Sequence, residues 1–203
     1  IIKLYISKLM KYSFQKIKQL VQSKGYSWFE TGDYNLNIVG IRSNQKNQIT
    51  NQFDDLITIS YLISGVEQYH EYPITTEPGI YYSQNLLNQS GVAILVPGQY
   101  RGCWQIGLHQ GKYEALVQRK PIKVYRDKDK DKEYDLLPET IDEGLFGINI
   151  HRSNPKGQSV EVGKWSAGCQ VFKSSEDFNL FINLCKKAQK VWGNSFTYTL
   201  INE

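Results

Sequence analysis

Residues 147–151 (GINIH) and 165–172 (WSAGCQVF) place His151 and Cys169 18 positions apart near the end of a chain of 203 residues. Between Phe146 and His151 apolar residues alternate with polar or small ones. This alternation predicts a β-strand whose apolar row lies on one face. We therefore expect His151 at the end of that strand, on the face opposite the apolar row.

Cys169 lies in a run of small residues that predicts a tight turn. Ser166 and Gly168 precede it, and in such turns backbone N–H groups can stay free to bind an oxyanion. A cysteine taken alone is more often a small buried hydrophobe, and a histidine at a strand end usually has no catalytic role. Taken together, His151 and Cys169 predict a base and a thiol nucleophile suited to acyl transfer.

The two segments resemble the motif of the L,D-transpeptidase (YkuD-like) family of peptidoglycan enzymes, in which a His is followed, after a spacer, by [Ser/Thr]-His-Gly-Cys. The matching residues are His151, Ser166, Gly168 and Cys169. The resemblance covers about residues 146–203. It implies a mainly β domain, a sandwich or open barrel of the YkuD-like type, and acyl transfer on peptidoglycan stem peptides through a thioester.

The resemblance also implies roles for single residues. His151 would be the base, and the backbone carbonyl of Arg152 would hold its other ring nitrogen. The N–H groups of Gly168 and Cys169 are the candidates for an oxyanion hole. Further candidates, for substrate binding, are Arg152, Trp165, Ser166 and His109.

The implied acyl donor is the stem tetrapeptide of peptidoglycan, which would be cut after its third residue with loss of the terminal D-alanine. Transfer to an amine would make a cross-link. Transfer to water would make the protein an L,D-carboxypeptidase or an amidase. No cofactor is expected for either reaction.

Two positions depart from the family pattern. Ala167 stands where the family usually has a second His, and Val171 stands where it commonly has Arg. That Arg is a candidate for holding the turn or an acidic stem peptide. Arg152 and Lys164 are the nearest cations that could replace it, and we expect Arg152 to bind the substrate carboxylate.

The segment after the cysteine turn predicts a helix and a closing strand. Ser174 is a candidate N-cap with Asp177 three residues later. Gly193 would end the helix before a strand over residues 196–201. The apolar residues at helical spacing between them are Phe178, Phe181, Ile182, Cys185, Ala188 and Trp192.

Upstream of the motif the chain predicts further strands, bounded by turn residues. They are expected over residues 36–41, 56–61, 92–96, 113–118 and 122–125. Another strand is expected to begin at Ile80, after Pro78-Gly79, and this stretch loosely resembles one that lies near the active site in the family. The order of elements implies a mainly β domain with peripheral helices.

Residues 1–25 are expected to form an amphipathic helix packed on a single β-rich catalytic domain of residues 26–203. One helical face would carry Met10, Phe14, Ile17 and Val21. Lysines interrupt the apolar runs of this segment, so neither a signal peptide nor a spanning helix is expected. The resemblance implies action at the bacterial cell envelope, and export would then need a route that does not use this segment.

The composition fits an ordinary folded enzyme. The hydrophobic fraction is 40% and the aromatic fraction 13%, with 14 tyrosines, which suits a β-rich protein. A net charge of +4, with scattered basic residues, gives little support for nucleic-acid binding and suits an anionic cell-wall polymer. Cys103 and Cys185 fit core positions. The cysteines and histidines have no spacing that suits a zinc site. A monomer is expected.

Residues 127–135 form the most charged segment. Its Asp-x-Asp-x-Asp start is similar to a calcium loop, but Lys132 and Pro138 stand where such a loop needs Gly and Glu. The lysines within it also offset much of its charge. A solvated loop is therefore favoured, with calcium binding as an alternative.

Two other functions stay open from the sequence. The chain could be a catalytically silent binding module, and Cys169 would then be buried or unreactive. It could also be a thiol amidase that acts on another peptide. A papain-like protease is disfavoured because His151 precedes Cys169.

Overall fold

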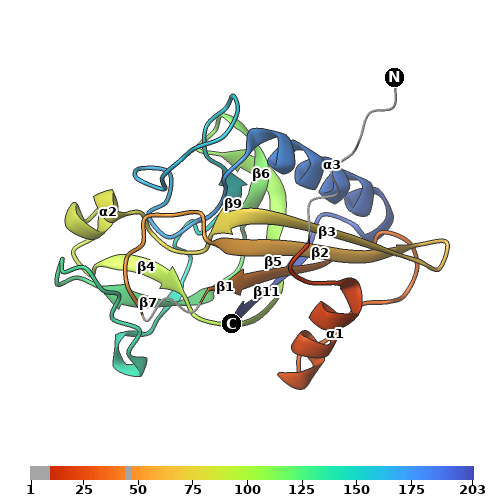
Figure 1. The fold of residues 1–203 in the computed structure, drawn as a ribbon, viewed down its shortest axis with the longest axis horizontal. Helices are drawn as coiled ribbons and strands as arrows, with labels where there is room; N and C mark the ends of the chain where they lie inside the picture. Colours follow the sequence, from red (N-terminus) through yellow and green to blue (C-terminus); the bar gives the residue numbers. More distant parts are fainter. Residues whose placement is uncertain (1–9, 44–46) are drawn as a thin grey trace.

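The computed structural model describes residues 10–43 and 47–203, and this part of the chain is mainly β (Figure 1). Eight strands pair into a closed barrel. The expected mainly β class is confirmed, and the sheet closes on itself rather than forming a sandwich or an open barrel. In barrel order the strands are β1 (Asn37–Arg42), β11 (Phe196–Asn202), β5 (Gly98–His109), β6 (Tyr113–Gln118), β9 (Ile150–Arg152), β10 (Gln170–Phe172), β3 (Val66–Thr75) and β2 (Asp55–Ile63).

A second sheet of three strands lies beside the barrel. Its order is β4 (Val92–Leu95), β7 (Ile122–Asp127) and β8 (Asp142–Gly144), and both pairings are antiparallel. A 3-10 turn, η1 (Pro138–Thr140), precedes β8. Within this three-stranded sheet, the four-residue strand β4 is fully buried, so the sheet supports the loops that contact it.

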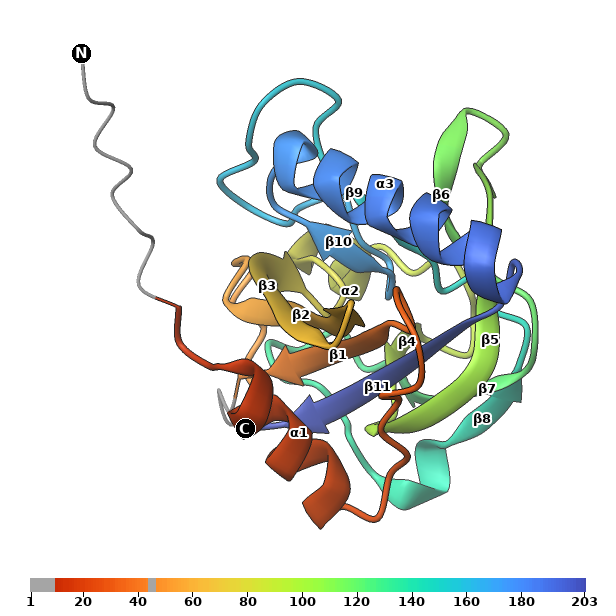
Figure 2. The same cartoon turned by 90° about the vertical axis from the view of Figure 1, so that its right-hand side faces the viewer.

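Helix α3 (Ser175–Trp192) covers the barrel on the side of β6, β9 and β10 (Figure 2). The predicted ends are confirmed: the Ser174 side chain accepts a hydrogen bond from the N–H of Asp177, and Gly193 follows with φ of 82°. The predicted apolar face is buried except for Trp192, which is 45% exposed. Its indole N–H donates to the Asp33 carbonyl at 2.8 Å, which holds the ring at the surface.

Helix α1 (Phe14–Ser23) packs on the outside of the barrel. Ser13 caps it, and its buried residues are Phe14, Ile17 and Val21, as predicted. Ile17 and Val21 belong to a small apolar cluster that includes Ile41 of β1. The helix was expected over residues 1–25 but begins at Phe14, and residues 1–9 lie outside the described part of the chain. Met10 precedes the helix and is 50% exposed, so it does not share the buried face.

Two elements differ from the sequence-based expectation. The pattern does not predict β3, because its residues are largely polar or aromatic and most are only half-buried. Residues Ile80–Gln84 form a short helix, α2, rather than the start of a strand. Gly79 begins this helix, and the Ser83 hydroxyl donates to the Ile80 carbonyl at 2.9 Å, which favours the helical turn.

Strand pairing brings distant residues to one end of the barrel. β9 and β10 are parallel, with His151 opposite Val171. β6 pairs with β9 on its other side, and the β5–β6 hairpin places His109 opposite Tyr113. The predicted base therefore meets two aromatic residues from another part of the chain.

Candidate active site

Ile148 and Ile150 belong to the core and His151 does not, as the alternation predicts. The predicted strand is only partly confirmed, because β9 begins at Ile150 and His151 lies within it rather than at its end. The side chain is nevertheless only 4% exposed. The ring of His109 stacks on it with centroids 4.0 Å apart, and the Tyr113 hydroxyl lies 3.2 Å from its Nδ1. The histidine is thus held in place by a second layer of aromatic groups.

Hydrogen bonding assigns the proton of the neutral His151 ring to Nδ1. This atom lies 2.8 Å from the backbone oxygen of Arg152, and a carbonyl oxygen can only accept a hydrogen bond. The Tyr113 hydroxyl donates to the same oxygen at 3.3 Å. Nε2 therefore carries a lone pair and has no partner within residues 10–43 and 47–203. This is the bond to Arg152 that the resemblance implied.

Cys169 is half-buried and lies immediately before β10. It stands two residues before Val171, which pairs with His151 across the β9–β10 ladder. Its Sγ donates to the Gly147 carbonyl at 3.5 Å and accepts from the N–H of Asn149 at 3.4 Å. No hydrogen bond joins Sγ to His151 in the described residues, so the thiol and the base lie on neighbouring segments without direct contact.

The thiol and the imidazole are both neutral at rest. Burial raises the pKa of Cys169 to about 11, against a smaller lowering by the N–H of Asn149. Burial, followed by the neighbouring His109, lowers the pKa of His151 to about 3. A preformed thiolate–imidazolium pair is therefore disfavoured in the free site. The proton has to move as the thiol attacks.

The cysteine turn offers one backbone N–H to an oxyanion rather than two. The N–H of Gly168 donates to Ser166 Oγ at 3.1 Å, so its predicted role as an oxyanion donor is wrong. Ser166 is fully buried and its hydroxyl donates to the Cys169 carbonyl at 2.8 Å, so it holds the turn and, contrary to prediction, cannot reach a substrate. The Cys169 N–H has no acceptor in the described part of the chain and remains the candidate donor.

Two glycines allow the turn to pack closely. Gly168 has φ of +131°, and a Cβ on it would lie 2.2 Å from the Ala93 carbonyl oxygen of β4. A Cβ on Gly79 would lie 2.1 Å from the Gly163 oxygen, and its N–H donates to the Ser166 carbonyl at 2.8 Å. The Pro78-Gly79 stretch therefore lies directly against the cysteine turn.

A cavity of about 500 Å³ lies beside His151. Lys112, Arg152 and Lys164 line it, and its described lining contains no carboxylate. The Arg152 guanidinium packs 4.0 Å from the centroid of the Tyr113 ring. These charges favour an anionic ligand.

Two predicted substrate-binding residues also line this cavity. Trp165 is 40% exposed there, and His109 forms part of the wall. The ammonium group of Lys164, next to Trp165, lies 4.1 Å from the centroid of the Tyr81 ring. The structure therefore gathers Arg152, Trp165 and His109 around the predicted base.

Tyr82 borders this cavity and a second hollow of about 280 Å³. Trp165 lines the first and Ala167 the second, so the segment before Cys169 borders both, whereas Cys169 itself lines neither. Sequence reasoning missed Tyr113, because a single tyrosine in a tyrosine-rich β protein carries no local signal of a site.

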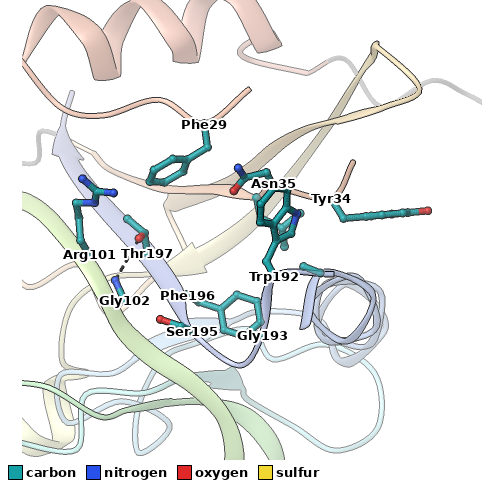
Figure 3. Close-up of a pocket in the computed structure, with 12 residues that line it drawn as sticks. Phe29, Tyr34, Asn35, Arg101, Gly102, Trp192, Gly193, Ser195, Phe196 and Thr197 are labelled. Atoms are coloured by element: carbon teal, nitrogen blue, oxygen red, sulfur yellow. Dashed lines mark hydrogen bonds between the residues drawn. The ribbon is translucent and has the colours of Figure 1, made fainter. Parts of the chain in front are cut away.

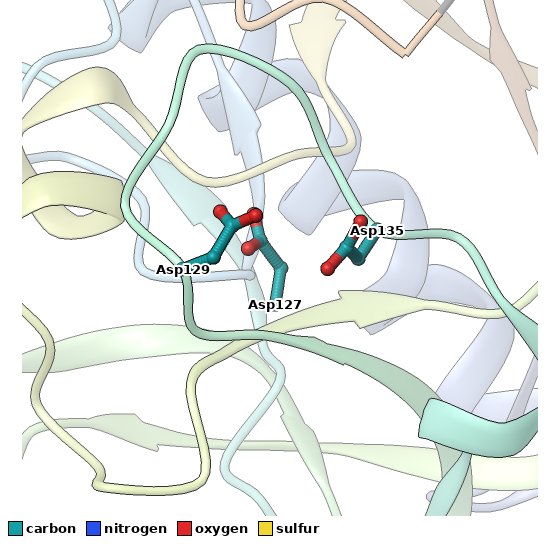
Figure 4. A group of neighbouring side chains, drawn as sticks. All are labelled: Asp127, Asp129 and Asp135. Atoms are coloured by element: carbon teal, nitrogen blue, oxygen red, sulfur yellow. The ribbon is translucent and has the colours of Figure 1, made fainter.

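Three aspartates of the charged loop after β7 gather in space (Figure 4). One carboxylate oxygen from each of Asp127, Asp129 and Asp135 lies within 4.8 Å of the others. Burial, followed by the neighbouring carboxylates, raises the pKa of Asp127 to about 6. Such clusters are common without an ion, so calcium binding stays an alternative drawn from the sequence.

A separate hollow of about 330 Å³ lies near the start of β5 and the end of α3 (Figure 3). Phe29 and Trp192 are among its aromatic lining residues, and Arg101 is its cation. Arg101 lies near the start of strand β5 and His109 ends it, so this hollow and the cavity at His151 lie toward opposite ends of that strand. None of the predicted site residues lines it.

Comparison with known proteins adds no assignment to this geometry. No family model, curated protein or solved structure matches the chain. Within the described residues, the helices lack the length and apolar character needed to cross a membrane. The function is therefore argued from the motif and the geometry of the site.

Proposed function

We propose that this protein is a cysteine-dependent acyltransferase or hydrolase of peptidoglycan stem peptides, with a YkuD-like catalytic domain of the L,D-transpeptidase type. One observation carries the proposal: the Arg152 carbonyl binds Nδ1–H of His151 and leaves Nε2 as a base, on the strand next to the one that Cys169 immediately precedes. A cation-lined cavity beside this pair supports it. The site of action would be the bacterial cell envelope.

The first half-reaction acylates the thiol. Sγ of Cys169 leaves the Gly147 carbonyl, gives its proton to Nε2 of His151 and attacks the carbonyl carbon of the scissile amide. The oxyanion accepts a hydrogen bond from the Cys169 N–H, a kind of donor worth about 2.7–4 kcal/mol. His151 then protonates the leaving amine, the C–N bond breaks and a thioester remains.

The second half-reaction releases the acyl group. Nε2 of His151 takes a proton from an amine or a water molecule, which attacks the thioester, and the thiolate of Cys169 recovers the proton. An amine acceptor gives a cross-linked product, whereas water gives an L,D-carboxypeptidase or amidase reaction. The same residues perform both reactions, and the mass of the product distinguishes transfer to an amine from transfer to water.

The charge of the cavity supports a substrate that carries carboxylates. Lys112, Arg152 and Lys164 offer three cations to a stem tetrapeptide, whose terminal D-alanine ends in a carboxylate. Arg152 can bind such a group in a bidentate manner and is already oriented by the Tyr113 ring. The two hollows that Trp165 and Ala167 border suit an extended peptide.

Mass spectrometry of purified protein incubated with disaccharide-tetrapeptide tests the proposal. We expect loss of the terminal D-alanine, accompanied by cross-linked dimer if an amine is the acceptor. Cys169→Ala should abolish the reaction, and Cys103→Ser, remote from the turn, is the matched control that should keep it. Wild-type turnover by the Cys169→Ala protein would exclude the mechanism. Cleavage of casein but not of the tetrapeptide would favour the thiol amidase.

A binding module without catalysis is the second candidate. The raised pKa of Cys169 and its hydrogen bond to the Gly147 carbonyl favour a thiol that stays protonated. In that case no thioester should be detected on the intact protein during incubation. Binding of the tetrapeptide should also be the same for the wild type and for Cys169→Ala.

A further inference from the structure

His109 and His151 form a stacked pair of rings at the wall of the cavity. Their centroids are 4.0 Å apart and their planes differ by 22°. Both are buried, with His109 8% exposed and His151 4%. The acyl-transfer steps above use only one imidazole, and they do not say which atom of His109 would contact the substrate or which group it would bind.

Hydrogen bonds place the protons of the two rings on different nitrogens. The backbone N–H of Gln118 donates to Asn149 Oδ1 at 3.0 Å, which fixes Nδ2 as the other end of this amide. Nδ2 lies 3.0 Å from Nδ1 of His109 and can only donate, so Nδ1 accepts. Neutral His109 therefore carries its proton on Nε2, whereas His151 carries its proton on Nδ1.

Both rings are held in the neutral form. Burial, with further lowering by Lys112 and Arg152, depresses the pKa of His109. The ring of His109 lines the cavity, and its Nε2 has no partner in the part of the chain that the structure describes. The pair thus offers a ligand two neighbouring groups. One is the Nε2–H of His109, and the other is the Nε2 lone pair of the base His151.

We propose that His109 is a substrate-positioning residue, whose Nε2–H donates a hydrogen bond to a carboxylate oxygen of the peptide and so holds the scissile amide beside His151. The neighbouring cations Lys112 and Arg152 attract the same group. Asn149 sets the required tautomer, and its backbone N–H contacts Sγ of Cys169, so one residue orders both the donor and the nucleophile. This inference rests on the proposed function and names the group that orients its substrate.

Binding of disaccharide-tetrapeptide to the Cys169→Ala protein, which cannot turn it over, tests the donor. His109→Phe keeps a stacking ring without the N–H and should weaken binding at least about tenfold. His109→Gln supplies an N–H again and should bind within about threefold of the parent protein. Gln110→Ala, on the exposed rim of the same cavity, is the matched control and should bind like the parent. Equal binding by His109→Phe and the parent would overturn the inference.

Nitrogen-15 NMR of the histidine rings tests the tautomer without any substrate. The wild type should show His109 protonated on Nε2. Asn149→Asp, whose carboxylate can only accept from Nδ1, should move that proton to Nδ1 and weaken tetrapeptide binding as much as His109→Phe does. A wild-type His109 protonated on Nδ1 would overturn the inference. Absence of tetrapeptide binding to the unmodified protein would instead overturn the proposed function, and the spectrum tells the two failures apart.

Discussion

The three thiols of the chain differ in access to solvent. Cys185 is fully buried and Cys103 is 7% exposed, whereas Cys169 is half-buried. Burial raises the pKa of all three. A small alkylating reagent should therefore modify Cys169 before the other two, as peptide mapping by mass spectrometry can show. Because the pKa of Cys169 is about 11, its rate should rise about tenfold per pH unit between about 7 and 9.

Earlier labelling of Cys103 or Cys185 would contradict this order of access. A labelling rate at Cys169 that does not change with pH would mean that its thiolate already exists at neutral pH. The neutral thiol and imidazole described for the free site would then be wrong.

The pH profile of the reaction should extend far into the acid range. His151 has a folded-state pKa of about 3, below its ordinary value, so it stays a neutral base until the pH falls towards that value. The same shift stabilises the fold above pH about 6.5, and this contribution is lost as the pH falls from there towards 3. Measurements of kcat/KM with circular dichroism at each pH separate the two effects. If activity fell to half near pH 6.5 while the protein stayed folded, the pKa of His151 would be that of an ordinary histidine and the lowered pKa would be wrong.

Arg152 should act on substrate affinity more than on chemistry. Its guanidinium lines the cavity and packs on Tyr113, whereas its backbone carbonyl holds His151 and is kept in any substitution. Arg152→Met should raise KM for the tetrapeptide at least about tenfold, equal to about 1.4 kcal/mol, with kcat little changed. Arg152→Lys, which keeps the charge, is the control. An unchanged KM in Arg152→Met would move carboxylate binding to Lys164 or Lys112.

At the scale of single elements, the sequence was sufficient to predict an element where several local signals lie within it. Helix α3 could be predicted with both ends because a capping serine, an apolar period and a terminal glycine all act within the helix itself. Strand β3 could not be predicted in this way. It is half-buried and largely polar, and its position depends on pairing with β2 and β10. The Ile80–Gln84 helix was missed because an apolar run of this length does not distinguish helix from strand.

Gly79 is the point at which α2 and the cysteine turn constrain each other. Gly79→Ala would put a Cβ 2.1 Å from the Gly163 oxygen, so the turn has to shift. We expect a loss of about 1–3 kcal/mol in the free energy of unfolding, together with lower kcat, measured by urea titration and tetrapeptide turnover. Gly98→Ala, whose Cβ would meet only ordinary contacts at 3.7 Å, is the matched control. Full stability and activity in Gly79→Ala would show that the turn can relax freely.

At the scale of the whole molecule, the sequence predicted the parts of the site that lie within the motif. The hydrogen bond from His151 to the Arg152 carbonyl is the one that the motif implies. The stacking of His109 on His151 was not predicted, because it depends on the register with which β5, β6 and β9 close the barrel. The loss of Gly168 as a donor depends on the rotamer of a buried serine, which sequence does not show.

The C-terminal strand β11 should be indispensable to the barrel. It lies between β1 and β5, so removal of residues 196–203 would open the ring and expose the paired edges of both neighbours. We expect this truncation to abolish cooperative unfolding, measured by circular dichroism during denaturant titration. Deletion of Glu203 alone removes its exposed contacts to Lys11 and Tyr12 and one backbone hydrogen bond to Arg42, and should cost far less than removal of the strand. A cooperative, active truncated protein would contradict the closed-barrel description.

The connection between β9 and β10 has a further consequence, because parallel neighbours cannot be joined by a tight hairpin. The chain must make a long excursion over residues 153–169, and this excursion carries Lys164 and Trp165 to the wall of the cavity. Under the proposed function, substrate recognition depends on this loop, whereas His151 lies in β9 before it and Cys169 is its last residue, next to β10. Changes in the length and composition of the loop ahead of the cysteine turn should then alter substrate preference and leave the base and the thiol in place.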